Sequence, residues 1–316
     1  MVSLPDISQF ISIYGLFFIL GIGTIGNLLN LITLSMKDFR KNASIFYLLS
    51  ATITNQVFIS FGVIARYFTE SNGSNLINTN IYMCKLRNYL LIFMPLVGIT
   101  CGFLASFDRC VSTSPNNRWR QLSSIDLAQR ICAASILFLI ISSSFCLFAY
   151  GIPNGTCTPY PGIWSIITNI YTSVLIFCIP IAGNSICGIL TWYHLKKSRS
   201  RVQPRVSNNE TLSGSRRMNR DLIILTFVQA CLFTVTYALR WFTFDYAIAT
   251  AFEQKSVLRK QIENLILQIS LVFMYTSHSI PFYLNYLLCN GFRKTFQICL
   301  QNSANKCLRI FRFTKT

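Results

Sequence analysis

One uncharged stretch limits what this chain can fold into. Between Lys85 and Arg87 on one side and Asp108 and Arg109 on the other, no residue is charged, and most are Leu, Ile, Phe, Val, Gly or Cys. A helix from Cys84 to Arg109 would be roughly 37 Å long at about 1.5 Å per residue, against about 30 Å for the hydrocarbon core of a bilayer. The stretch therefore predicts a membrane-spanning helix with a cysteine at one face and an Asp-Arg pair at the other.

Composition points the same way. Only 12% of the 316 residues are charged, whereas a soluble domain has about 25%. The net charge of +18 is also a feature of nucleic-acid-binding proteins, so the positions of the basic residues have to decide between the two classes.

The whole chain predicts an all-α membrane protein, a bundle of seven transmembrane helices forming a single domain over residues 1–316. A short interfacial helix is expected at 291–300, where Phe292, Phe296 and Leu300 are four residues apart, followed by a tail at 301–316. The polar segment 196–220 holds eight Lys or Arg and is typical of a flexible basic loop. The expected spans are residues 9–36, 44–67, 82–112, 127–150, 164–194, 221–244 and 258–288.

The basic residues indicate an orientation. The segments after spans one, three, five and seven hold about twenty Lys and Arg, and the other segments about seven. The positive-inside rule then predicts an extracellular N-terminus and a cytoplasmic C-terminus, and it accounts for the net charge without nucleic acid. The N-terminus has no Lys or Arg before its first apolar run and no small-residue cleavage site, so we expect no cleaved signal peptide.

Two further features agree with this orientation. Glycosylation sequons begin at Asn72 and Asn154 in the predicted outer loops, although Asn42 and Asn209 match the pattern on the inner side. Cys84 and Cys157 also fall on the outer side. Because only that side is oxidising, these two cysteines can form a stable disulfide.

The complete pattern resembles the rhodopsin-like (class A) G-protein-coupled receptors, and within them invertebrate peptide receptors. The resemblance covers essentially the whole chain. The residues that carry it are Asn27 and Asn55 in the cores of spans one and two, the Cys84–Cys157 pair, the sequence Asp108-Arg109-Cys110, and Pro281 running into Phe292. Pro180 in span five and Pro281 in span seven are expected to kink their helices.

The resemblance implies a receptor in the plasma membrane that binds an extracellular ligand and activates a heterotrimeric G protein, with arrestin and kinases as further partners. Arg109 would pair with Asp108 at rest and turn to the G protein when span six moves. Cys299 and Cys307, beside the interfacial helix, are palmitoylation candidates. His278 is expected to be a hydrogen-bonded core residue, and no metal or cofactor is expected.

Several positions depart from the family pattern. Asn55 replaces an acidic residue, Cys110 an aromatic one, Thr236 a proline, and Leu284 a tyrosine. Ile280 stands before Pro281 where the family has a polar residue, and tryptophans usual in spans four and six are absent. A modified switch is therefore expected, with a less kinked span six.

The ligand class can be narrowed. Leu91 occupies the position of the acidic residue in amine receptors, and Met274 that of the retinal-binding lysine, so amine and retinal ligands are disfavoured and a peptide is favoured. Six basic residues at the outer ends favour an acidic group on the ligand, namely Arg66, Lys85, Arg87, Arg240, Arg259 and Lys260.

Two alternatives stay open. The first is a receptor-like seven-helix protein, chemosensory or a dimer partner, that does not couple to a G protein. The second is a transporter or channel, which would place ionisable residues at mid-membrane and contain internal repeats, neither of which the sequence has. No nucleophile–base pair, metal cluster or phosphate loop suggests an enzyme.

Overall fold

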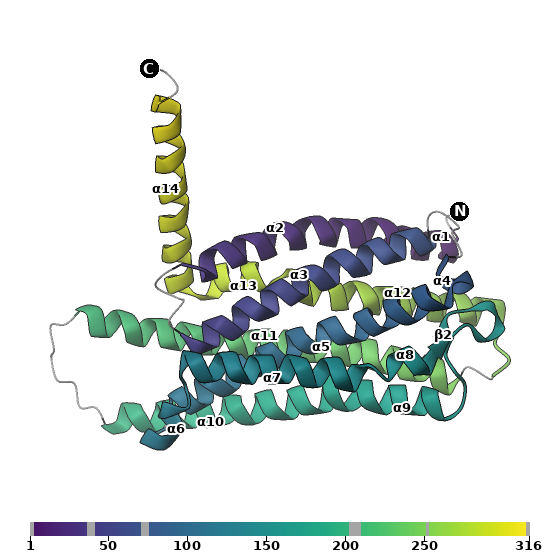
Figure 1. Ribbon diagram of the computed structural model, residues 1–316, viewed down its shortest axis with the longest axis horizontal. Helices are drawn as coiled ribbons and strands as arrows, with labels where there is room; N and C mark the ends of the chain where they lie inside the picture. The colour runs from purple at the N-terminus through teal and green to yellow at the C-terminus, as the bar shows by residue number, and fades with distance from the viewer. Residues whose placement is uncertain (1–2, 37–41, 71–75, 202–209, 251–252, 314–316) are drawn as a thin grey trace.

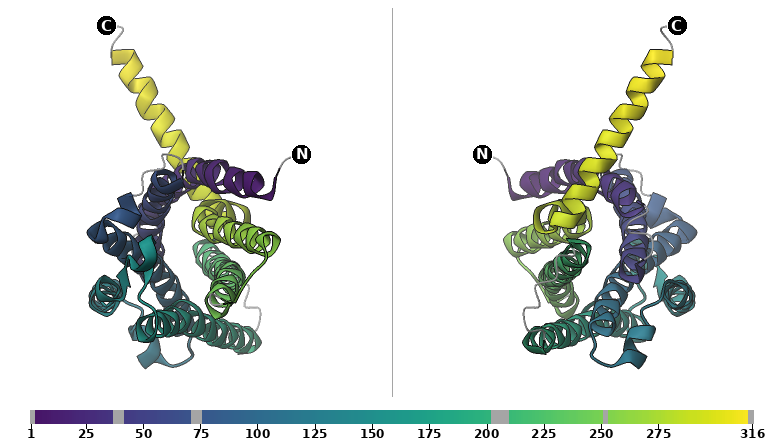
Figure 2. Two further views of the ribbon diagram at one scale, coloured as in Figure 1. Left: turned by 90° about the vertical axis from the view of Figure 1, so that its right-hand side faces the viewer. Right: turned by 90° about the vertical axis from the view of Figure 1, so that its left-hand side faces the viewer.

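Long helices lie side by side along one axis in the computed structural model (Figure 1). The structure describes residues 3–36, 42–70, 76–201, 210–250 and 253–313. It is an all-α bundle apart from one two-stranded hairpin in the described part. An end-on view shows the helices arranged around the bundle axis, with the final helix projecting sideways (Figure 2).

Six helical segments are long and apolar enough to cross a membrane, and a bent pair brings the number to seven if it counts as one span. The N-terminal segment combines α1 (Leu4–Phe10), η1 (Ile11–Gly15) and α2 (Leu16–Leu34). The others are α3 (Ala43–Glu70), α5 (Ile81–Ser112), α7 (Ile125–Ser143) with α8 (Cys146–Ala149), α9 (Ile163–Thr172) with η3 (Ser173–Cys178) and α10 (Ile179–Arg201), and α11 (Glu210–Ala249).

The bent pair is the expected seventh span. α12 (Val257–Ser279) and α13 (Pro281–Leu288) meet at Ile280 with a bend of 54°. Pro281 has no backbone N–H and its ring displaces the preceding turn, so the helix cannot continue straight through it. The expected span over 258–288 is thus divided into two helices at its predicted kink position, Pro281.

Two expected non-helical segments contain helix. α10 reaches Arg201 and α11 begins at Glu210, so the predicted loop 196–220 is helical at both ends, and residues 202–209 lie outside the described part. α14 (Asn290–Phe313) extends the predicted interfacial helix through most of the predicted tail. Adding a residue to an existing helix costs far less than nucleating one, and no Gly or Pro lies between Phe292 and Phe313.

Side-chain caps fix several helix starts. Before α1, Ser3 Oγ accepts a hydrogen bond from the Asp6 N–H, and the Asp6 carboxylate accepts one from the Ser3 N–H. Asn80 accepts from the Tyr82 and Met83 N–H groups at the start of α5. Short elements complete the chain, namely α4 (Leu76–Thr79), α6 (Asn117–Gln121), β1 (Tyr150–Gly151), η2 (Pro153–Gly155) and β2 (Thr158–Pro159).

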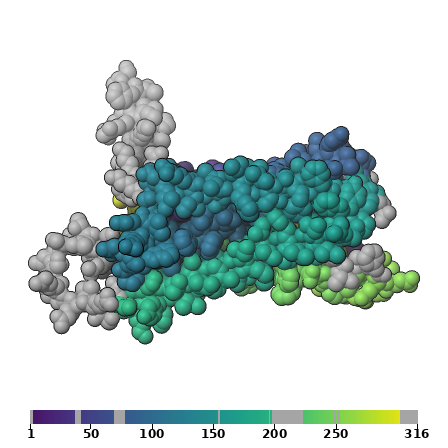
Figure 3. Space-filling model, turned by 60° about the horizontal axis from the view of Figure 1, so that its bottom comes forward, coloured from purple at the N-terminus to yellow at the C-terminus, as the bar shows by residue number. Residues whose placement is uncertain are grey.

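α5 is the central helix. It packs against α3, α7, α10 and α11 and buries Leu96, Val97 and Cys101. The outer faces of the bundle are apolar. Figure 3 shows the face formed by α7, α9 and α10, and these helices expose large apolar side chains such as Phe138, Ile141 and Ile170. Apolar side chains directed outward are expected where lipid surrounds a helix.

Candidate functional site

A disulfide closes one end of the bundle. It joins Cys84 at the start of α5 to Cys157 beside the β1–β2 hairpin, which is the pairing expected from the sequence. The Cys157 N–H donates to Asn78 Oδ1 at 3.0 Å. These contacts hold the hairpin over the helix ends, and we call this the disulfide end. The opposite end, which carries Arg109, is the Arg109 end.

A cavity of about 270 Å³ lies below the hairpin at the disulfide end. Arg66 of α3, Arg87 of α5 and Arg240 of α11 line it, together with aromatic side chains that include Tyr150 and Trp241. No Asp or Glu occurs among the described lining residues. The cavity is therefore positively charged and aromatic.

Neutral groups hold two of these arginines. Arg66 donates to Ser12 Oγ at 3.1 Å and to Gln268 Oε1 at 2.6 Å. Arg240 donates to Ser270 Oγ at 3.5 Å, and its guanidinium lies 5.7 Å from the centre of the Phe244 ring. These contacts position the two guanidinium groups but do not neutralise their positive charge. A bound anion would be attracted to both.

The other three predicted cations do not line this cavity. Arg259 is paired with Glu253 and Glu263, each at 3.0 Å, and Lys260 is exposed. Lys85 is half-buried at the start of α5. Of the six basic residues expected to favour an acidic ligand, three therefore line the cavity and three do not.

A buried histidine connects three helices near the centre of the bundle. His278 of α12 is fully buried, and its Nδ1 lies 2.7 Å from Asn55 Oδ1 of α3. Its Nε2 lies 2.5 Å from the Tyr237 hydroxyl of α11. Since the Asn55 oxygen can only accept, Nδ1 carries the proton and Nε2 accepts from Tyr237. His278 is thus a hydrogen-bonded core residue.

Asn27 joins the same region. It is fully buried in α2, and its Nδ2 donates to the His278 carbonyl at 3.4 Å and to Gln56 Oε1 at 3.2 Å. The predicted core residues Asn27 and Asn55 therefore meet through His278 and not directly. Gly98 of α5 passes so close that an added Cβ would lie 2.7 Å from Asn55 Oδ1.

A second chain of amides lies closer to the Arg109 end. Gln229 of α11 donates to Asn285 of α13 at 3.0 Å, and Asn285 donates to Asn30 of α2 at 2.7 Å. Asn30 in turn donates to Thr52 of α3 at 2.8 Å. Sequence reasoning missed this chain. The sequence did contain a signal for it, namely amide side chains within apolar spans. Burying such an amide is costly unless a neighbouring helix supplies a hydrogen-bond partner.

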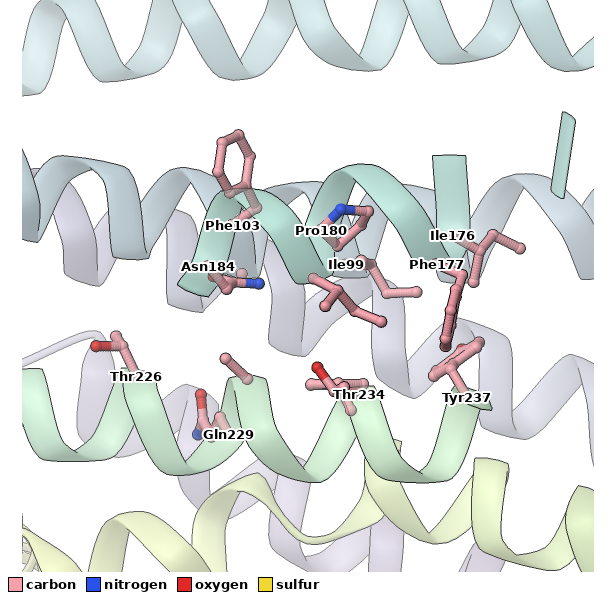
Figure 4. A pocket seen from close by; sticks show the side chains of 14 residues that line it. Ile99, Phe103, Ile176, Phe177, Pro180, Asn184, Thr226, Gln229, Thr234 and Tyr237 are labelled. Carbon is pink, nitrogen blue, oxygen red and sulfur yellow. The ribbon is translucent and has the colours of Figure 1, made fainter. Parts of the chain in front are cut away.

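α10 and α11 are separated by a small cavity of about 40 Å³, shown in Figure 4. Phe177, Pro180 and Asn184 line one side, and Gln229, Thr234 and Tyr237 the other. The π-helical segment η3 ends two residues before Pro180. Because Pro180 has no N–H to donate to the preceding turn, the widened segment is the local consequence of this proline.

Replacing Asn184 with leucine is expected to stabilise the protein by about 1 kcal/mol. Its Oδ1 is buried and accepts no hydrogen bond from the described residues, and such an acceptor costs about 1–3 kcal/mol. Thermal unfolding in detergent should show a midpoint a few degrees higher. Gln229→Leu is the matched control, because it breaks a bond to Asn285 and should lower the midpoint. A lower midpoint for Asn184→Leu would contradict the conclusion that the buried Asn184 amide destabilises the protein.

At the Arg109 end, Asp108 and Arg109 form a buried ion pair. Their exposed fractions are 6% and 5%, and Arg109 Nη2 lies 3.1 Å from Asp108 Oδ2. Ser44 of α3 bridges the two by accepting from Arg109 Nε and donating to Asp108 Oδ2. The expected pairing of these neighbours is present, with α3 holding both.

Two further side chains complete this group, which we call the Arg109 cluster (Asn42, Ser44, Asp108, Arg109 and Ser123). Asn42 precedes α3 and accepts from Arg109 Nη2 as well as from the Ser44 N–H. Ser123 lies between α6 and α7 and donates to Asp108 Oδ1 at 2.7 Å. Both carboxylate oxygens of Asp108 are therefore occupied. A carboxylate and a guanidinium can stay charged in the interior only where hydrogen bonds and the opposite charge offset their loss of hydration.

A larger cavity, about 360 Å³, opens beside Arg109 between α5, α10 and α11. Trp192 and Phe227 line it and are 64% and 54% exposed, so the cavity reaches the outside of the bundle. Arg109 lines its inner wall. Movement of α11 away from α10 would enlarge the space next to this guanidinium.

The remaining predicted residues are placed as follows. Cys110 is buried beside the Cys187 thiol of α10. Cys299 is half-buried in α14, next to Phe296, which packs on Phe282 with ring centres 5.3 Å apart. Asn154 is in η2 at the disulfide end, whereas Asn72 and the side chain of Cys307 lie outside the described part. In the described ranges, no three His, Cys, Asp or Glu side chains are placed to hold a metal ion.

Two comparisons with known proteins found no match. No protein-family model matches the chain, and no curated protein has significant similarity to it. The features on which a function can be proposed are thus the arginine-lined cavity, the buried polar chains and the Arg109 cluster.

Proposed function

We propose that this chain is a rhodopsin-like G-protein-coupled receptor of the plasma membrane, which binds an extracellular ligand at the disulfide end and activates a heterotrimeric G protein at the Arg109 end. The observation that carries the proposal is the Arg109 cluster. A buried arginine held by an adjacent aspartate and two α3-end side chains is a group that can be released. Its position next to the α10–α11 cavity gives the released side chain a place to go.

The ligand is proposed to be a peptide with an acidic group. Arg66, Arg87 and Arg240 would attract the acid, and the aromatic walls would bind apolar side chains. Leu91 and Met274 both line the cavity. A cationic amine would therefore find no counter-ion there, and retinal would find no lysine for a Schiff base.

Coupling between the ends would follow the polar chains. Tyr237 lines the ligand cavity and bonds His278, while Gln229, two helical turns along α11, bonds Asn285. A ligand that prefers a different position of α11 would favour breaking these bonds together. A population shift of this kind requires the ligand to bind the open state more tightly than the resting state.

Basal nucleotide exchange on purified G proteins tests the proposal. Membranes with wild type should stimulate exchange, and Arg109→Ala should abolish the signal at matched surface expression, because the side chain that contacts the G protein is gone. Arg118→Ala is the control, since it removes an exposed positive charge from α6 at the same end and should change little.

Equal signals above background from wild type and Arg109→Ala would contradict the proposal. Loss of signal in both arginine variants would indicate a general charge effect. If no G-protein subtype responds to wild type, a peptide-library screen read by arrestin recruitment separates a silent receptor from the alternative of a receptor-like protein without G-protein coupling.

A further inference from the structure

Ser123 follows two arginines at a distinctive spacing. The sequence Arg118-Trp-Arg120-Gln-Leu-Ser123 places a guanidinium three and five residues before a hydroxyl. Kinases whose substrate groove is acidic select substrates with arginine at these positions, because each guanidinium can pair with a carboxylate of the groove. Arginines three and five residues before a serine are therefore a sequence pattern that such a kinase can recognise.

The local structure makes this segment available. α6 has only five residues, and Arg118, Arg120 and Leu122 are all exposed. Ser123 and Ser124 lie outside any helix, between α6 and α7. A single helical turn is marginally stable on its own, so the segment can become extended in a kinase groove at little cost.

The hydroxyl of Ser123 is also part of the Arg109 cluster, where it donates to Asp108 Oδ1 at 2.7 Å and is half-buried. Ser124, its neighbour, is committed instead to capping α7 through the Leu127 N–H at 3.4 Å. Only the first of these adjacent serines therefore connects the exposed basic segment to the buried aspartate.

We propose that Ser123 is a phosphorylation site for an arginine-directed protein kinase, and that phosphate at this position opens the Arg109 cluster. In the transfer, Ser123 Oγ attacks the γ-phosphorus of ATP and forms the new O–P bond. The bond from phosphorus to the β,γ-bridging oxygen breaks, ADP leaves with the electron pair, and the hydroxyl proton passes to the base of the kinase.

A phosphate on Ser123 would turn its hydrogen bond with Asp108 into a repulsion. A serine hydroxyl donates to Asp108, whereas a phosphoserine carries about −1.5 to −2 charges and offers acceptor oxygens. It would repel the carboxylate at hydrogen-bond distance and compete with it for Arg109. Phosphorylation thus removes the bond to Asp108 Oδ1 and weakens the hold on Arg109. The consequence for signalling rests on the proposed function, but the modification and the opening do not.

The test uses the full chain in lipid nanodiscs with Mg-ATP and the catalytic subunit of cAMP-dependent protein kinase. Mass spectrometry should find phosphate on Ser123, lost in Ser123→Ala, largely lost in Arg120→Ala, and retained in Ser124→Ala. The Arg120 side chain is exposed and donates to Asn117 in the same short helix, so its variant should fold normally. Phosphate absent from Ser123, or unaffected by Arg120→Ala, would overturn the site assignment.

Amide hydrogen exchange tests the opening without a G protein. Exchange over residues 105–113 should increase after phosphorylation of wild type and remain unchanged in Ser123→Ala treated identically. Unchanged exchange in fully phosphorylated wild type would overturn the opening. Increased exchange without any G-protein response would support this inference and count against the proposed receptor function.

Discussion

Replacing Cys84 with serine is expected to lower the free energy of unfolding by about 4 kcal/mol and, with the proposed plasma-membrane location, to remove most of the protein from the cell surface. The disulfide closes a loop of 73 residues, and the entropy that it removes from the unfolded chain corresponds to about 4 kcal/mol for a loop of this size. It also fixes the hairpin that forms part of the wall of the arginine-lined cavity.

Surface biotinylation and thermal unfolding would measure this effect. Cys157→Ser and the double variant should match Cys84→Ser, because all three remove the same bond. Cys231→Ser is the control, since Cys231 is a free cysteine exposed on α11. Wild-type surface levels and thermal midpoint in Cys84→Ser would show that the bond contributes no stability.

Replacing His278 with leucine is expected to cost about 3 kcal/mol. The substitution keeps an apolar side chain of similar size but leaves Asn55 Oδ1 and the Tyr237 hydroxyl buried without their partner, at about 1–3 kcal/mol each. The ring also contacts Phe58 and Phe233, with centres 4.7 and 5.3 Å away. Loss of these contacts adds to the cost.

The second histidine of the chain supplies the control. His194 is only half-buried near the end of α10, so His194→Leu should shift the thermal midpoint much less than His278→Leu. In a double-mutant cycle, His278→Leu and Tyr237→Phe should cost less together than the sum of the two single changes. Strict additivity would mean that the hydrogen bond between them contributes nothing.

The positions of the membrane-spanning helices could be predicted from the sequence because they depend on a local quantity, the length of apolar chain free of charge. The ends were less accurate. Pro281 indicated a kink, but the sequence does not determine a bend of 54°, which depends on what α12 and α13 pack against. Helix beyond Leu300 and before Asp221 forms by propagation from the neighbouring helical segments. An assessment of each residue's polarity alone does not include this effect.

In the candidate site, too, some contacts could be predicted from the sequence and others depend on how the helices pack. Asp108 and Arg109 are adjacent in the sequence, so their pairing was predictable. Asn42, Ser44 and Ser123 come from other segments, and only the packing of α3 and the α6–α7 connection on α5 brings them together. Arg259 was grouped with Arg240, but its partners Glu253 and Glu263 lie within six residues of it, and the second has the i,i+4 spacing of a helical ion pair, so this pairing could have been predicted from the sequence.

Asp108→Asn gives the most direct test of the Arg109 cluster as a resting-state lock. The amide cannot neutralise Arg109, so the resting arrangement should weaken and basal nucleotide exchange should rise several-fold over wild type at equal surface expression. Adding Arg109→Ala to this variant should return exchange to background. Unchanged exchange in Asp108→Asn, or activity that survives loss of Arg109, would contradict the proposal that release of this arginine is the switch.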